Sequence, residues 1–245
     1  MKIKCIVSYD GTLFAGYQVQ PKLRTVQGEL EGALKKLHKG HEVKVAASGR
    51  TDAGVHAVGQ VIHFETPLNI PADRWGVALN SLLPADITVI DVAAASDDFH
   101  ARFDAVGKEY RYTVLRSAQR NPFVRNYAYY YPYSLDLALI EAAKTHLMGT
   151  HDFTSFCSAK SEVEDRVREL RSIEVHEDGD KLIFSFIGNG FLYNMVRILT
   201  GTLLSVGAGE IAPDEIPEIL KKKNRIYAGK TAPAHGLYLW EVFYN

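Results

Sequence analysis

The chain has 245 residues, of which 47% are hydrophobic and 23% are charged, and its net charge at pH 7 is −1. This balance excludes a disordered, a collagen-like and a coiled-coil protein. The length suffices for one large domain or two small ones, with a core that needs neither a disulfide nor a metal.

The two cysteines, Cys5 and Cys157, are too few for a disulfide framework. They predict two buried thiols in a reducing cytoplasm. Strand-like sequence follows Met1 directly, and the longest uncharged run is short and contains Asn189 and Asn194. We therefore expect a soluble, cytoplasmic protein with no signal peptide and no membrane span.

The first part of the chain predicts the element order β-α-β-β-α-β. Apolar, β-branched residues before the turn signal Asp10-Gly11 indicate a strand, and apolar residues at helical spacing end before Gly40 and before Pro84. The expected strands are residues 3–9, 43–47, 60–65 and 87–93, and the expected helices are 26–39 and 71–83.

The second part of the chain predicts the same order again, without a residue-level repeat. Ser134 is the expected cap of a helix that stops before Gly149, and Asp178-Gly179-Asp180 is a hairpin signal. The expected strands are residues 108–116, 168–176, 181–187 and 237–244, and the further helices are 191–206 and 213–223.

These two sets of elements predict an α+β fold of two tandem ferredoxin-like or RRM-like units. We expect residues 1–105 to form the first unit and residues 106–245 the second. No flexible linker separates them, so we expect the units to share an extended, mixed and mainly antiparallel sheet. The groove between the units is then the expected place for a substrate.

The charge is distributed unevenly despite its near-zero sum. Residues 99–131 contain six basic and two acidic side chains together with nine Tyr or Phe, and residues 221–230 contain a second basic run. Basic side chains among aromatic ones suit unpaired or flipped nucleotides, because the cations contact phosphates while the rings stack on bases. For the second run, a solvated helix end remains the alternative.

The segment between the strands expected at 43–47 and 60–65 contains Arg50 and Asp52 between glycines. In an extended backbone both side chains point to one side, and a neighbouring arginine keeps a carboxylate ionised. An ionised, partly desolvated aspartate is a suitable nucleophile. The alternative is an Asx-type turn in which Asp52 caps its own backbone.

Metal and nucleotide cofactors are not expected. His146 and His151 are five residues apart and lack the context of a zinc site. The sequence contains neither a P-loop nor a dinucleotide-binding glycine motif.

The segment 48–56, Ser-Gly-Arg-Thr-Asp-Ala-Gly-Val-His, resembles the catalytic motif of the TruA-type tRNA pseudouridine synthases. The resemblance extends along the whole chain. It includes residues 9–11, 14–18, 98–103, 108–112, 188–197 and 232–237.

This resemblance implies the pseudouridine synthase fold and the conversion of uridine to pseudouridine at positions 38, 39 and 40 of the tRNA anticodon stem-loop. It also implies a homodimer with no metal or organic cofactor. By residue-for-residue match, Asp52 in the first unit is the catalytic nucleophile, and Tyr110 on a strand of the second unit contacts the uridine. Arg50, Arg197 and Leu237 are implied to line the active-site cleft.

The residues agree with this chemistry. The isomerisation replaces the N1–C1′ bond by a C5–C1′ bond and is redox-neutral, so one carboxylate can serve as the nucleophile. Tyr110 can stack on the flipped base. A glycosidase would need a paired acid and base. Two alternatives remain open: a non-catalytic RNA-binding module of paired RRM-like units, and a base-excising N-glycosidase.

Arg197 is the only charged residue between Leu182 and Gly209. Its apolar neighbours on the expected helix predict burial, and an unpaired buried guanidinium would be costly. We expect Asp52, across the groove, to be its carboxylate partner, as the family resemblance also implies.

Overall fold

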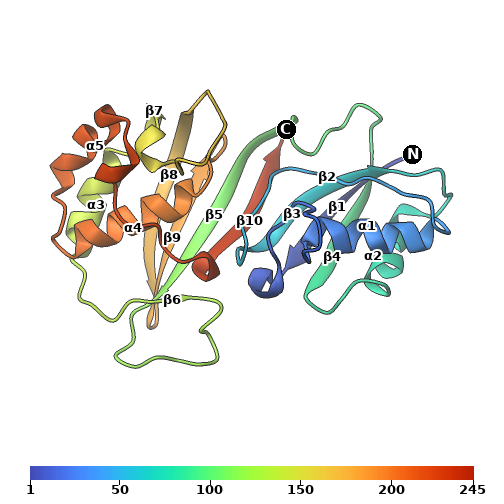
Figure 1. Cartoon of the computed structure of the whole chain (residues 1–245), viewed down its shortest axis with the longest axis horizontal. Coiled ribbons are helices and arrows are strands. Elements are labelled where there is room, and N and C mark those ends of the chain that lie inside the picture. Colours follow the sequence, from blue (N-terminus) through green and yellow to red (C-terminus); the bar gives the residue numbers. More distant parts are fainter. The chain divides into compact units, whose positions relative to one another are not determined.

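The computed structural model describes all 245 residues and divides the chain into two compact units (Figure 1). Unit 1 comprises Met1–Val106 and Tyr238–Asn245, and unit 2 comprises Gly107–Leu237. The sequence placed all of residues 106–245 in the second unit, whereas the closing residues group with unit 1. They do so because Tyr238 and Leu239 pair in parallel with His56 and Ala57 of unit 1.

The strands of unit 1 follow the order β4-β1-β3-β10. Strand β1 is antiparallel to both β3 and β4, and β10 is parallel to β3, so the pairing is mixed. The short β2 pairs with β3 and covers two residues instead of the expected 43–47. The bounds are β1 Lys2–Tyr9, β2 Ala46–Ala47, β3 His56–Glu65, β4 Ile87–Ala95 and β10 Leu237–Tyr244.

Two helices complete unit 1: α1 Val26–Leu37 and α2 Ala72–Asn80. The side chain of Thr25 caps α1 by accepting a hydrogen bond from the Gly28 amide. Trp75 of α2 is fully buried and meets the Phe64 ring edge to face, with ring centroids 5.2 Å apart. Helix α2 ends at Asn80, earlier than Pro84 suggested, because a turn follows it directly.

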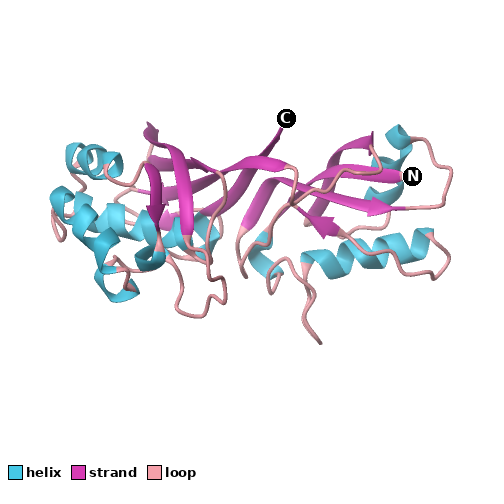
Figure 2. Cartoon of the chain, turned by 90° about the horizontal axis from the view of Figure 1, so that it is seen from above, coloured by secondary structure: helices cyan, strands magenta, loops and turns pink.

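The strands of unit 2 follow the order β5-β9-β8-β7, and β6 runs parallel to β5. The three other strand pairs of this unit are antiparallel. Gly179, at φ 61°, lies in the turn between β8 and β9. The bounds are β5 Ala105–Leu115, β6 Tyr129–Tyr130, β7 Gly149–Asp152, β8 Val167–Asp178 and β9 Lys181–Gly188, all shown as magenta arrows in Figure 2.

Three α-helices belong to unit 2: α3 Leu137–Thr145, α4 Met195–Gly207 and α5 Ile216–Lys222. Asp136, and not Ser134, caps α3 by accepting from the Ala138 and Leu139 amides. Helix α4 starts at Met195 instead of residue 191, because Asn194 has a left-handed backbone with φ 62°. Single-turn 3-10 helices lie at Gly11–Leu13, Thr154–Phe156, Pro213–Glu215, Arg225–Tyr227 and Ala234–Gly236.

These elements confirm the predicted α+β class. The chain contains five α-helices and strands in mixed pairing, in the order β-α-β-β-α-β through β4. None of the helices is long and apolar enough to cross a membrane.

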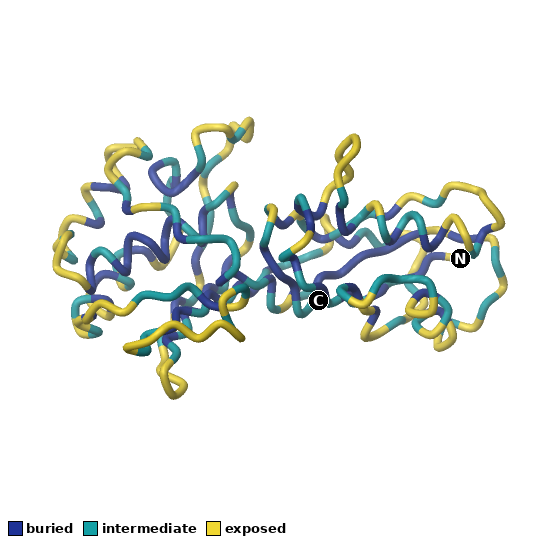
Figure 3. Tube along the Cα trace, turned by 60° about the horizontal axis from the view of Figure 1, so that its bottom comes forward, coloured by how far each residue is buried: buried dark blue, intermediate teal, exposed yellow.

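Helix α4 is buried along most of its length (Figure 3), and residues 229–232 lie directly on it. A Cβ atom added at Gly201 would lie 1.8 Å from the Lys230 carbonyl oxygen, and one added at Gly229 would lie 2.6 Å from Cα of Thr202. The Gly229 amide donates to Oγ1 of Thr202 over 2.9 Å. The two glycines therefore allow the segment to approach the helix backbone.

This close approach predicts opposite effects for two helical glycines. Gly201→Ala should lower the free energy of unfolding by about 1–3 kcal/mol or more, because the added methyl group overlaps the backbone at Lys230. Gly32→Ala in α1 meets no atom within 4 Å and should raise it by about 0.5–1 kcal/mol. Chemical denaturation measures both, and a Gly201→Ala protein as stable as the wild type would contradict the packing.

Candidate active site

The predicted catalytic segment, residues 48–56, forms the loop between β2 and β3 of unit 1 and ends at His56, the first residue of β3. Its first part is fixed by two fully buried side chains. Oγ of Ser48 donates to Oε1 of Gln60 over 2.7 Å, and Nε2 of Gln60 donates to the Gly49 carbonyl oxygen over 2.9 Å. Gln60 thus connects the loop to strand β3.

Asp52 begins a tight turn. The Val55 amide donates to the Asp52 carbonyl oxygen over 3.1 Å, and Gly54 has φ 77°. This conformation at the third residue of a turn favours glycine. The turn leaves Asp52 half-buried, an environment in which a carboxylate is partly shielded from water.

The residue before Asp52 is held by the segment that follows β1. Oη of Tyr9 and Oγ1 of Thr51 form a buried hydrogen bond of 2.7 Å. The Tyr17 amide donates to the Thr51 carbonyl oxygen over 3.0 Å. Gly16, at φ 102°, lies so close that an added Cβ would be 3.1 Å from that oxygen. Thr51 is therefore held through both its side chain and its backbone.

Burial also determines the state of the two tyrosines at this loop. It raises the pKa of Tyr9 to about 12, and it raises the pKa of Tyr17 well above its ordinary value.

 Both phenols therefore stay protonated at neutral pH, and Tyr9 serves the loop as a hydrogen-bonding group and not as a base.

The far end of the loop is held by residues that follow β1 and by β10. A Cβ atom added at Gly11 would lie 2.0 Å from the Val55 carbonyl oxygen, so this position requires glycine. The Gly11 amide donates to Nδ1 of His56 over 3.0 Å. The buried His56 ring stacks on Tyr238, with ring centroids 4.8 Å apart.

Arg50 and Asp52 lie in different environments. Arg50 is exposed, whereas Asp52 is half-buried. The turn that follows covers residues 52–55, so the common orientation of the Arg50 and Asp52 side chains stays a prediction.

Tyr110 lies on β5 of unit 2 and is 8% exposed, on the same strand face as the fully buried Tyr112 and Val114. Its ring meets Phe191 edge to face, with centroids 5.0 Å apart. Tyr110 is therefore more buried than an ordinary half-buried strand tyrosine, and an aromatic neighbour fixes its ring.

Arg197 lies in the first turn of α4 and is half-buried. Its Nε donates to the Ala232 carbonyl oxygen over 2.7 Å, and its Nη1 donates to Oδ1 of Asn194 over 2.8 Å. The Ala232 amide in turn donates to the Arg197 carbonyl oxygen over 3.0 Å. The two side-chain bonds orient the guanidinium, and the backbone bond holds residue 232 against the helix; a bond to Asp52 stays a prediction.

The segment after Ala232 is fixed on β5 and leads to Leu237. Oη of Tyr112 donates to the Pro233 carbonyl oxygen over 2.7 Å. A Cβ atom added at Gly236 would lie 2.7 Å from the Tyr112 ring. Burial raises the pKa of Tyr112 far above its ordinary value. Leu237 itself is 5% exposed, and the segment that leads to it is bonded to Arg197 of α4 at Ala232.

The five predicted site residues thus belong to two groups. Arg50 and Asp52 lie on one loop of unit 1, and Tyr110, Arg197 and Leu237 lie in unit 2. Sequence reasoning did not assign a role to the residues that hold the Asp52 loop. Their only signal was that residues 9–11 and 14–18 belong to the motifs of the family resemblance.

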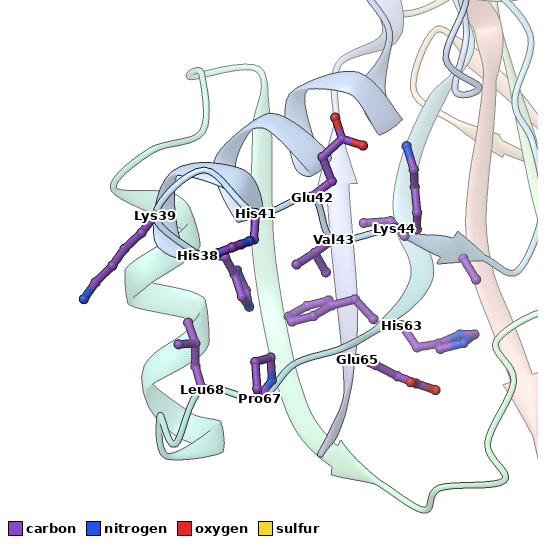
Figure 4. A pocket seen from close by; sticks show the side chains of 13 residues that line it. His38, Lys39, His41, Glu42, Val43, Lys44, His63, Glu65, Pro67 and Leu68 are labelled. Atoms are coloured by element: carbon purple, nitrogen blue, oxygen red, sulfur yellow. The ribbon is translucent and has the colours of Figure 1, made fainter.

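A separate cavity of about 740 Å³ lies in unit 1, next to the end of α1 and to β3. Figure 4 shows its side chains, among which Lys39 points away from the others. Its lining contains none of the predicted site residues; it consists of His38, Lys39, His41, Glu42, Val43, Lys44, Val45, Ala46, His63, Phe64, Glu65, Pro67 and Leu68. No group of three or more His, Cys, Asp or Glu side chains in the chain is arranged to hold a metal ion.

Comparison with known proteins identifies the class of enzyme. The chain matches the protein family described as tRNA pseudouridine synthase over residues 5–104 and 143–245. Pseudouridine synthases are isomerases, and the chain belongs to this tRNA pseudouridine synthase family.

Two relatives illustrate the similarity along the full length. The chain is 59% identical over 244 residues to tRNA pseudouridine synthase A 1 of Bacillus cereus, and the match covers 100% of this chain and 99% of the relative. It is 57% identical over 246 residues to tRNA pseudouridine synthase A of Bacillus subtilis, with 100% of both chains covered.

Among solved structures, the chain resembles one in the crystal structure of a Cbf5-Nop10-Gar1 complex. The TM-score is 0.36 with 16% identity, and the match covers 82% of this chain and 45% of the other. No conclusion about function follows from a similarity at this level.

The buried bond between Tyr9 and Thr51 predicts a positioning role for Tyr9. Such a hydrogen bond is worth about 0.5–1.5 kcal/mol, so Tyr9→Phe should lower kcat roughly 2- to 10-fold and leave KM for RNA unchanged. Steady-state kinetics of pseudouridine formation measures both constants.

The matched control is Tyr244→Phe, which removes a hydrogen bond of 2.6 Å to the Ala101 carbonyl oxygen elsewhere in unit 1. It should leave kcat unchanged. Equal effects of the two substitutions on kcat would mean that Tyr9 acts only through general stability.

Proposed function

We propose that this protein isomerises uridine to pseudouridine at positions 38, 39 and 40 of the tRNA anticodon stem-loop, with Asp52 as the nucleophile. Membership of the tRNA pseudouridine synthase family supports the reaction and the kind of substrate. The observation that carries the assignment of Asp52 is its loop, in which a half-buried carboxylate follows the doubly held Thr51.

The reaction rearranges bonds within one nucleotide. The N1–C1′ bond breaks, the uracil turns within the site, and a C5–C1′ bond forms. The hydrogen on C5 leaves as a proton and N1 gains a proton, so no net oxidation or reduction occurs. Asp52 acts as the nucleophile that permits the glycosidic bond to break, and the partly desolvated site strengthens its interaction with the sugar-base unit.

Tyr110 has the properties of a partner for the displaced base. A base that reacts in this way must leave its stack, which costs a few kcal/mol, and an aromatic ring offsets part of that cost. The edge-to-face contact with Phe191 holds the Tyr110 ring in one orientation. We assign Tyr110 to stacking on the uracil, with its hydroxyl available for a proton or a hydrogen bond.

In this proposal Arg197 and Leu237 complete the site around Asp52. Arg197 is oriented by Ala232 and Asn194, which suits a planar guanidinium that pairs with a carboxylate. Leu237 immediately precedes Tyr238 in the chain, and Tyr238 stacks on His56, four residues after Asp52. This connectivity supports Leu237 as a residue that lines the pocket.

Arg50 has a different part in the proposal. Its side chain is exposed, so we assign it to a phosphate of the RNA near the reacting nucleotide and not to the ionisation of Asp52. The protein acts in the cytoplasm as a homodimer, as the family resemblance implies.

The first test is Asp52→Asn, which keeps the shape of the side chain and removes the nucleophile. We expect no pseudouridine from a tRNA transcript, with tRNA affinity and the unfolding midpoint retained. Nucleoside analysis by chromatography and mass spectrometry detects the product, which has the mass of uridine.

The control for this test is Asp73→Asn on α2, whose carboxylate is exposed, and it should be fully active. Turnover by Asp52→Asn at the wild-type rate would reject the nucleophile assignment. Release of free uracil by the wild-type protein would identify an N-glycosidase instead.

The second test separates the ring of Tyr110 from its hydroxyl. Tyr110→Phe retains stacking, worth about 1–3 kcal/mol, so it should bind tRNA like the wild type and react more slowly. Tyr110→Leu should weaken tRNA binding as well. If both variants bind and react like the wild type, Tyr110 is only a core residue.

A further inference from the structure

The most exposed large apolar side chain in the protein is Phe123, which is 88% exposed. It lies in the connection between β5 and β6 of unit 2. This connection begins after Leu115 and ends at Tyr129, and β6 pairs in parallel with β5. A single exposed apolar side chain is ordinary on a protein surface, so the argument for a contact here comes from the residues around Phe123.

The segment that contains Phe123, residues 116–133, has no acidic residue. It has three arginines, Arg116, Arg120 and Arg125, and five tyrosines at positions 127, 129, 130, 131 and 133. Arg116 is paired with Glu177 of β8 over 2.7 Å, whereas Arg120 and Arg125 are exposed. We call residues 116–133 the arginine-tyrosine loop.

The tip of this loop is held by its own hydrogen bonds. The Phe123 amide donates to Oδ1 of Asn121 over 3.0 Å, and the Ala128 amide donates to the Val124 carbonyl oxygen over 3.1 Å. Nη1 of Arg125 donates to the Pro122 carbonyl oxygen over 2.7 Å. The Phe123 ring is therefore presented to solvent from a turn of defined conformation, which lowers the entropic cost of binding.

Further ring contacts join the tyrosines in the second half of the loop. The Tyr129 and Tyr131 rings, and the Tyr131 and Tyr133 rings, meet edge to face with centroids 5.8 and 5.1 Å apart. Cζ of Arg120 lies 5.6 Å from the centre of the Tyr130 ring. The loop thus combines cations and aromatic rings in a segment without acidic residues, a composition that suits unpaired nucleotides.

A second exposed phenylalanine shows that exposure alone is not the argument. Phe103 of unit 1 is 76% exposed and lies 5.9 Å from Cζ of Arg102. Three acidic residues, Asp97, Asp98 and Asp104, accompany it in the sequence and oppose the approach of a phosphate backbone.

We propose that the arginine-tyrosine loop binds an unpaired nucleotide of the RNA substrate, with the base stacked on Phe123 and neighbouring phosphates at Arg120 and Arg125. This inference rests on the proposed tRNA substrate. Leu115, where β5 ends, is five residues from Tyr110, or about 17 Å along the strand. The nucleotide at the loop is therefore a different one from the uridine assigned to Tyr110.

The test compares Phe123→Ala, Phe123→Tyr and the control Val77→Ala in the full chain. Affinity for an unmodified tRNA transcript is measured by fluorescence anisotropy at one fixed salt concentration. Phe123→Ala should raise Kd about tenfold, because stacking on one ring is worth about 1–3 kcal/mol. Phe123→Tyr keeps the ring and should bind like the wild type. Val77→Ala removes a 69% exposed apolar side chain from α2 of unit 1 and should also bind like the wild type.

Salt dependence tests the phosphate contacts separately. Arg120→Gln should raise Kd and reduce the slope of log K against log salt by about 0.7–0.9, the value for one released counterion. A loss of affinity with an unchanged slope would place Arg120 away from phosphate and contradict that part of the proposal.

The outcomes distinguish this inference from the proposed function. If the wild type makes pseudouridine while Phe123→Ala binds tRNA with the wild-type Kd, the loop is not an RNA contact and the function stands. If Phe123→Ala changes the sedimentation behaviour and leaves Kd unchanged, the loop contacts a second copy of the chain and the inference is overturned. If the wild type neither binds tRNA nor makes pseudouridine, the proposed function fails, and the inference fails with it.

Discussion

The position of Asp52 depends on the close approach of two backbone segments that only glycine permits. Gly11 brings the chain after β1 onto Val55, and Gly16 brings it onto Thr51, so the loop is enclosed before and after the carboxylate. A side chain at either position would push the loop away and separate Tyr9 from Thr51. A nucleophile, the role proposed for Asp52, must be held to within about 0.5 Å of its productive position, and this contact would supply the constraint.

Unit 2 uses the same physical means for its own part of the site. Gly201 admits the segment that ends at Ala232, and Gly236 admits the Tyr112 ring against the residues before Leu237. Side-chain bonds from Arg197 and Tyr112 to main-chain carbonyl oxygens then fix the segment laterally. In both units, functional residues on irregular segments gain the rigidity of the strands and helices they touch, because backbone contact leaves no space for movement.

The sequence predicted those parts of the fold that local patterns determine. Strand β10 has the predicted bounds because large residues follow one another along it. The strands β8 and β9 meet at the predicted glycine turn. The start of α4 was wrong because a left-handed Asn194 leaves no periodic signal. The grouping of β10 with unit 1 depends on its pairing with His56, a contact between distant residues that no local pattern indicates.

The same distinction explains what the sequence indicated about the site. Asp52 and Tyr110 were found through motifs of contiguous residues, whereas Tyr9 and Thr51 meet across 42 residues and no local pattern marks their bond. Net charge was equally uninformative, since a total of −1 conceals an acid-free run from residue 116 to 133. A polyanion senses charge over about one Debye length of 8–10 Å, so the local surface, and not the sum, determines where RNA can bind.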